Sequence, residues 1–166
     1  MRCFQLDENF DDADFAAKCR EEEQCIVIRY PRHRKRQKDS IMLPSLLVPD
    51  YPLLTLDHRI IEQNHQWIPD NNGGVIVVRL NRPVRTMTTA LAARIVAAFK
   101  KKLTMWASID WSRVYLDLSE TEAYVCPLTE NPDLTKGIAV RYDDPHFEPK
   151  LVDAITKASP RAITHH

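Results

Sequence analysis

The sequence lacks any apolar run long enough to span a membrane, and it does not begin with a charged region followed by a long apolar one. These absences argue against a membrane span and a secretory signal, so we expect a cytoplasmic protein without a membrane partner. An excess of one charge is also missing, because 23 Lys and Arg residues balance 23 Asp and Glu residues. Any contact with nucleic acid must therefore come from a local basic cluster.

Closely spaced cysteine pairs are absent as well. The four cysteines stand far apart in the chain, at Cys3, Cys19, Cys25 and Cys126. Zinc sites usually take their ligands from pairs such as CxxC, so we expect no zinc site. The pattern favours reduced thiols that are mostly buried.

Short apolar runs alternate with helical patterns over most of the chain. With 166 residues, the chain is long enough for one core and too short for two full domains. The apolar runs predict strands at 2–6, 25–28, 53–56 and 75–80. Intervening helices predict that these strands are parallel, which makes the fold class α/β. Alternating segments at 111–118 and 123–128 predict an added antiparallel hairpin, followed by a strand at 137–142 and a helix at 148–157.

Two of the predicted strands end in the same dipeptide, Leu-Asp. Asp7 follows the first strand and Asp57 follows the third, and each stands just before a helical pattern. If the strands are parallel neighbours, both carboxylates lie at the sheet edge where ligands collect in open α/β folds. This arrangement predicts a metal site in outline. The alternative is that each aspartate caps the helix after it, which is a favoured role for Asp.

A basic stretch follows the second predicted strand. It runs from Arg29 to Lys38 and contains Tyr30 together with the basic residues Arg32, Arg34, Lys35 and Arg36. Clustered Arg and Lys can bind the phosphates of RNA, and a tyrosine ring can stack on an unpaired base. The alternative is a solvated loop or helix face, which is the usual role of a charge run.

Four segments together resemble the PIN-like superfamily. Within it, they are most similar to small bacterial proteins that open with a Leu-Asp-Glu-Asn motif and are often paired with antitoxins. The segments are Leu6-Asp7-Glu8-Asn9, Asp39-Ser40, Thr55-Leu56-Asp57 and the strand at 73–79. The similarity covers residues 1–128, the expected PIN-like domain, and leaves 129–166 as a C-terminal extension.

The resemblance implies a three-layer α/β/α sandwich with a mainly parallel sheet and an acid cluster that holds Mg²⁺ or Mn²⁺. Asp7 matches the first-strand aspartate of the family, and Asp39 matches the acid that begins the middle helix. Asp57 matches the aspartate of the Thr-x-Asp motif, and Thr55 matches its hydroxyl residue. These three aspartates are the expected metal ligands.

One position departs from the family pattern. Arg59 stands where the family often has a further acid, two positions after Asp57. Glu62, one helical turn beyond the strand, is the expected substitute and fourth catalytic residue, ahead of Asp70. Two functions therefore stay open. The first is a metal-dependent ribonuclease, with a cognate antitoxin and a second copy of the chain as implied protein partners. The second is a binding module that holds RNA or a protein without cleavage.

Overall fold

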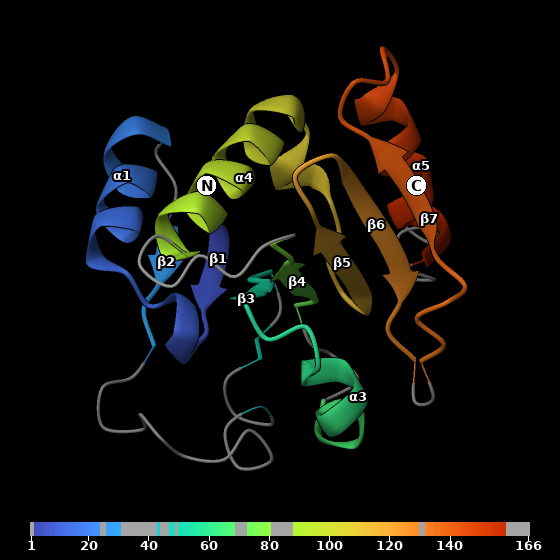
Figure 1. The fold of residues 1–166 in the computed structure, drawn as a ribbon, viewed down its shortest axis with the longest axis horizontal. Helices are drawn as coiled ribbons and strands as arrows, with labels where there is room; N and C mark the ends of the chain where they lie inside the picture. Colours follow the sequence, from blue (N-terminus) through green and yellow to red (C-terminus); the bar gives the residue numbers. More distant parts are fainter. Residues whose placement is uncertain are drawn as a thin grey trace.

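The computed structural model describes residues 2–23, 26–30, 43, 47–48, 50–68, 73–80, 88–129 and 132–158. Within these residues, seven strands form one mixed sheet with helices on both faces (Figure 1). The predicted α/β class, the mainly parallel sheet and the antiparallel C-terminal hairpin are confirmed.

The sheet is parallel over its first five strands in space. The spatial order is β2-β1-β3-β4-β5-β6-β7. Strands β2, β1, β3, β4 and β5 run parallel to one another, and β6 and β7 are antiparallel to their neighbours. The strand bounds are β1 (Arg2–Leu6), β2 (Ile26–Ile28), β3 (Leu53–Thr55), β4 (Val75–Val78), β5 (Val114–Leu118), β6 (Glu122–Pro127) and β7 (Ile138–Arg141).

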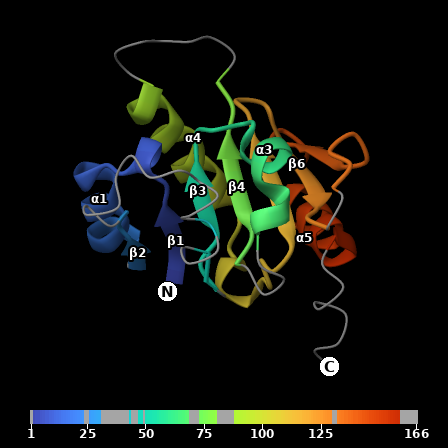
Figure 2. The ribbon, with the colours of Figure 1, turned by 90° about the horizontal axis from the view of Figure 1, so that it is seen from below.

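The helices lie on the two faces of this sheet (Figure 2). Helices α1, α4 and α5 share one hydrophobic core with the sheet, and α3 belongs to a second core on the opposite face. No helix in the described part of the chain combines the length and the apolar character needed to cross a bilayer. The helix bounds are α1 (Ala13–Glu23), α3 (Ile60–Asn64), α4 (Thr88–Lys102) and α5 (Phe147–Ala158), with 3-10 turns η1 (Glu8–Phe10), η3 (His65–Trp67) and η4 (Trp106–Ser108).

Aromatic rings join the helices of the larger core to the sheet. Phe4 of β1 lies 5.0 Å from Trp106, and Phe99 of α4 lies 5.9 Å from the same indole. Phe147 of α5 contacts Phe99 edge to face at 6.2 Å. Burial of each ring contributes about 1.5–3 kcal/mol. These contacts hold α4 and α5 against the sheet and keep its strand ends in fixed positions.

The smaller core lies under α3. Ile60 and Ile61 of α3 are almost fully buried, and they pack in one cluster with Leu53 of β3 and Val75 and Val77 of β4. These strand residues alternate with those facing the larger core, as the period of a strand requires. The packing fixes α3 beside the carboxyl ends of β3 and β4.

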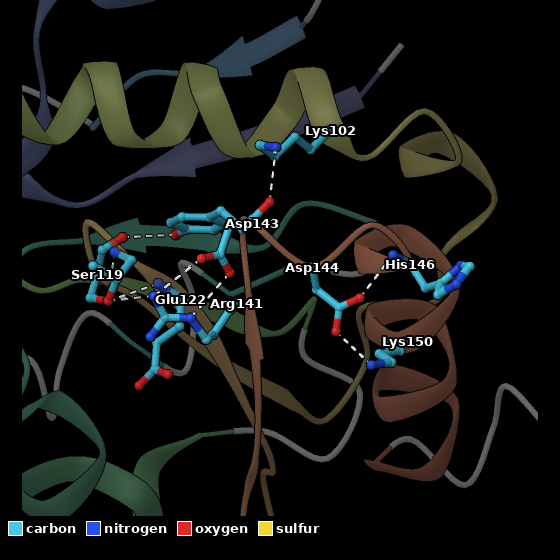
Figure 3. Close-up of polar contacts among 10 residues, drawn as sticks. Lys102, Ser119, Glu122, Arg141, Asp143, Asp144, His146 and Lys150 are labelled. Carbon is cyan, nitrogen blue, oxygen red and sulfur yellow. Dashed lines mark hydrogen bonds and ion pairs between the residues drawn. The ribbon is translucent and has the colours of Figure 1, made fainter.

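The described part of the C-terminal extension, residues 132–158, continues the same sheet. Strand β7 pairs with β6, and polar contacts fasten the turn that follows β7 (Figure 3). The Lys102 ammonium group at the end of α4 donates to the backbone carbonyl of Tyr142 at 3.0 Å. Asp144 accepts a bond of 2.5 Å from Lys150 of α5.

The prediction of reduced thiols is wrong for Cys3. Cys3, in the interior of β1, is disulfide-bonded. Cys19 and Cys126 are buried and are not disulfide-bonded, as expected. Spacing along the chain missed the disulfide because the fold, and not the sequence interval, decides which cysteines meet.

Candidate active site

Asp7 lies at the carboxyl end of β1 and begins the turn η1. Its Oδ1 accepts a 2.7 Å hydrogen bond from the Glu8 backbone N–H. The Asp7 backbone N–H donates to the Leu54 carbonyl of β3 at 2.9 Å. Asp7 therefore caps a turn, as the simpler interpretation expected, and it also stands at the edge where β1 and β3 end.

Thr55 connects the two predicted acids. Its hydroxyl donates to Oδ2 of Asp7 at 2.7 Å, and its oxygen accepts the Asp57 backbone N–H at 3.0 Å. Asn9 reaches the same group, because its Nδ2 donates to the Thr55 hydroxyl at 3.3 Å. Its Oδ1 accepts the Leu56 backbone N–H at 3.1 Å. The ends of β1 and β3 are thus joined by side chains as well as by the strand ladder.

Asp57 begins the turn that leads into α3, but it does not cap that helix, whose N-cap residue is Arg59. Its Oδ1 accepts the Arg59 backbone N–H at 3.0 Å, and its carbonyl oxygen accepts the Ile60 N–H at 3.2 Å. The Oδ2 atom accepts no hydrogen bond from any residue that the structure describes. The strand order changes direction between β1 and β3, and ligands bind at such switch points in open α/β sheets. The structure therefore brings Asp7, Thr55 and Asp57 together where sequence analysis predicted.

A pocket of about 350 Å³ opens beside this edge on the α3 face. One wall carries His58, Arg59 and Glu62, from the turn after Asp57 and from α3. All three side chains are exposed. None of them makes an ion pair or a side-chain hydrogen bond with a residue that the structure describes. Glu62, the predicted substitute acid, thus lines a cavity whose wall begins at His58, the residue after Asp57, whereas Asp7 and Asp57 themselves are not part of its lining.

The opposite wall comes from β4, β5 and β6, and sequence analysis missed it. Arg79 follows β4, and its Nε and Nη2 donate to Oδ2 of Asp117 on β5 at 3.1 and 2.9 Å. This hydrogen bond raises the pKa of Arg79. The Tyr115 hydroxyl donates to the same Oδ2 at 3.4 Å. The pKa of Tyr115 is raised, and burial of the side chain is the main cause. Tyr124 of β6 and Leu134 complete the lining.

Comparison of the chain with family models, curated proteins and solved structures finds no match. The PIN-like resemblance therefore remains a prediction, and the function has to be proposed from the geometry of the site.

Three of the predicted elements of the site lie outside the described residues. These are Asp39, the less favoured acid Asp70, and the basic positions Arg32, Arg34, Lys35 and Arg36. Among the residues that are described, no group of three or more His, Cys, Asp or Glu side chains is arranged to hold a metal ion. The described part of the predicted metal site therefore contains two of its three expected ligands, Asp7 and Asp57.

The first arginine of the basic stretch has a structural role. Arg29 follows β2, and its Nε forms a 2.5 Å ion pair with Asp11, whose side chain is only 2% exposed. The hydrogen bond to Asp11 raises the pKa of Arg29. This arginine fastens β2 to the segment before α1, so it is not one of the cations left for phosphate.

Proposed function

We propose that the protein is a metal-dependent endoribonuclease of the PIN-like type, which hydrolyses RNA phosphodiester bonds. The observation that carries the proposal is the Thr55 hydroxyl, which holds the Asp7 carboxylate while accepting the Asp57 backbone N–H. Two acids are fixed in this way at the switch point of a parallel sheet, next to a polar pocket.

The donor set fits Mg²⁺ or Mn²⁺. Mg²⁺ takes oxygen ligands, keeps several waters and often binds through one or two carboxylates together with substrate phosphates. Asp7 and Asp57 supply such carboxylates, and Asp39 is the expected third ligand. A carboxylate has about four lone-pair sites, so capping hydrogen bonds and metal coordination are compatible on one group. A bound divalent cation would supply activation of water and a counter-charge for the leaving oxygen.

The residues around the acids have separate tasks. Thr55 and Asn9 keep the two strand ends in register, and the hydrogen bonds that Asp7 and Asp57 accept from backbone N–H groups restrict the rotation of their carboxylates. Arg59 is exposed next to Asp57, where a guanidinium group can contact an RNA phosphate. The basic positions between Arg32 and Arg36 are expected to add contacts to the RNA backbone.

The test is cleavage of a mixed single-stranded RNA by the wild type and by Asp57→Asn. Each protein is assayed with Mg²⁺, with Mn²⁺ and with excess chelator. Asp153→Asn is the matched control, since Asp153 is an exposed residue of α5 on the other face of the sheet. We expect cleavage that requires both the metal and Asp57 and that is unchanged in Asp153→Asn. Cleavage by Asp57→Asn at the wild-type rate would remove the assignment.

A second candidate is an RNA-binding or protein-binding module of the same fold that does not cleave. Two observations favour it: the described residues hold no three-ligand group, and Arg59 occupies a position where the resembled family often has an acid. A wild type that binds the RNA but leaves it intact with every metal would support this alternative. Binding of a cognate antitoxin and formation of a homodimer remain predictions, and the geometry of this site does not address them.

A further inference from the structure

The pocket beside the acids presents charged groups that no described residue engages. Arg59 and Glu62 stand on one wall with exposed side chains, and neither forms an ion pair within the described residues. Arg59 is linked to the sheet edge that carries Asp7 and Asp57, because its backbone N–H donates to Oδ1 of Asp57. A ligand in this pocket would therefore lie next to the proposed cleavage site.

The facing wall presents a carboxylate oxygen in a sheltered position. The Asp117 side chain is only 13% exposed, and both contacts from Arg79 go to its Oδ2. The Tyr115 hydroxyl also contacts Oδ2, so Oδ1 receives no hydrogen bond from any described residue. Because Asp117 lines the pocket, this oxygen is available to accept a hydrogen bond from a ligand there.

The charges of the pocket limit the chemistry of its ligand. Arg59 and Arg79 are opposed by Glu62 and Asp117, so the pocket has no net positive charge with which to attract a simple anion. A fitting ligand carries one anionic group for the guanidinium groups and several N–H or O–H donors for the carboxylates. A nucleotide has this combination in its phosphate, its ribose hydroxyls and its base. The volume of about 350 Å³ lies in the range of small-ligand pockets.

An aromatic surface completes the match. The Tyr124 hydroxyl donates to the Leu134 carbonyl at 2.5 Å and accepts the Gly137 N–H at 2.7 Å. These two bonds fix the ring in the lining of the pocket, where an aromatic side chain can contact a base.

We infer that this pocket binds one nucleotide of the RNA. Arg59 and Arg79 hold its phosphate, and Glu62 and Asp117 accept hydrogen bonds from its sugar and base. The inference rests on the proposed function, because it names the part of the substrate that this edge of the sheet holds.

The test measures binding in excess chelator, where no metal-dependent cleavage occurs. The wild type is titrated by calorimetry with each of the four ribonucleoside 5′-monophosphates, with the matching nucleosides and with inorganic phosphate. We expect at least one monophosphate to bind about tenfold more tightly than its nucleoside or phosphate alone, since charge-assisted contacts to both parts are required. Arg59→Gln and Glu62→Gln should each weaken that binding by about fivefold or more.

Matched controls separate a local effect from a general one. Arg94→Gln on α4 and Glu120→Gln in the β5–β6 turn change the same charges at exposed positions outside the pocket, and both should bind like the wild type. Melting curves of all four variants establish that they are folded. Absence of saturable binding for every monophosphate, or wild-type affinity in both pocket variants, would overturn the inference.

The two proposals fail in different ways. A wild type that binds a monophosphate through Arg59 and Glu62 but cleaves no RNA supports the pocket and removes the nuclease. A wild type that cleaves RNA while both pocket variants bind nucleotides normally removes the pocket and leaves the nuclease.

Discussion

The hydroxyl group of Thr55 donates a 2.7 Å hydrogen bond to Oδ2 of Asp7 on the neighbouring strand. The same hydroxyl oxygen accepts the backbone N–H of Asp57 at 3.0 Å. Thr55 is completely buried, so water does not compete for these contacts. One buried hydroxyl thus sets the relative position of the two acids that the proposed chemistry needs.

Replacing Thr55 by valine tests this role. Thr55→Val keeps the shape of the side chain but removes its hydroxyl group. The Asp7 carboxylate then loses a hydrogen-bond donor, and the Asp57 backbone N–H loses its acceptor. We expect the free energy of unfolding to fall by about 1–3 kcal/mol. Urea denaturation measures the change. Thr55→Ser, which keeps the hydroxyl, should lose about 1 kcal/mol for the missing methyl group. A valine variant more stable than the serine variant would contradict this account.

The sequence predicted the strands better than their arrangement. The predicted segment 2–6 matches β1 at both ends, and 53–56 and 75–80 contain β3 and β4, because apolar runs bounded by turn signals are a strong local signal. The same signal does not say which strands are neighbours. For example, β5 pairs in parallel with β4 and then forms the hairpin with β6. The pairing with β4 depends on packing between residues far apart in the chain.

The site was likewise predictable where a local signal marks the residue, and not where distant strands come together. Asp7 and Asp57 were found because each follows its strand directly, and β1 and β3 are indeed parallel neighbours. Arg79 and Asp117 were missed because their ion pair joins two strands that are distant in sequence. A weak signal was present, since Arg79 follows the most apolar run of the chain and Asp117 interrupts an apolar strand.

Metal binding should be visible as thermal stabilisation. A ligand that binds only the folded state stabilises it by about 2.7 kcal/mol at 100 times its Kd. For a chain of this size, each kcal/mol raises Tm by about 2–4 °C. We expect Mn²⁺ to raise the Tm of the wild type and of Asp153→Asn, and to raise that of Asp57→Asn much less. An equal rise in all three proteins would place the metal elsewhere, and no rise in any would favour the binding module.

Gly74 cannot be replaced without strain. Its φ is +89°, and an added Cβ would lie 2.3 Å from the Trp111 carbonyl oxygen. The Gly74 carbonyl also accepts the Leu53 N–H at 2.9 Å, so a shift here disturbs both β3 and β4. Gly74→Ala should therefore lower the free energy of unfolding by about 2–4 kcal/mol, measured by denaturant titration. A loss below about 0.5 kcal/mol would show that the strand entry adapts without cost.

Glu148 is predicted to make the attachment of α5 dependent on pH. Its Oε1 accepts the Thr104 hydroxyl at 2.7 Å and the Met105 backbone N–H at 3.1 Å. The hydrogen bond from Thr104 lowers the pKa of Glu148 below its ordinary value. A carboxyl group whose pKa is lower in the folded state stabilises the fold above its unfolded pKa, and this contribution is lost as pH falls through the folded pKa.

Glu148→Ala should therefore be less stable than the wild type by about 0.5–1.5 kcal/mol near pH 7. The difference should shrink as the pH falls below the ordinary pKa of a glutamate, because the wild-type carboxylate, whose pKa is lowered, then takes up its proton. Denaturant titrations at several pH values measure the difference. Glu120→Ala is the control, because Glu120 is exposed in the β5–β6 turn and should show no such dependence. A stability difference between wild type and Glu148→Ala that stays constant down to pH 3 would mean that packing, and not the charged acceptor, holds α5 at this point.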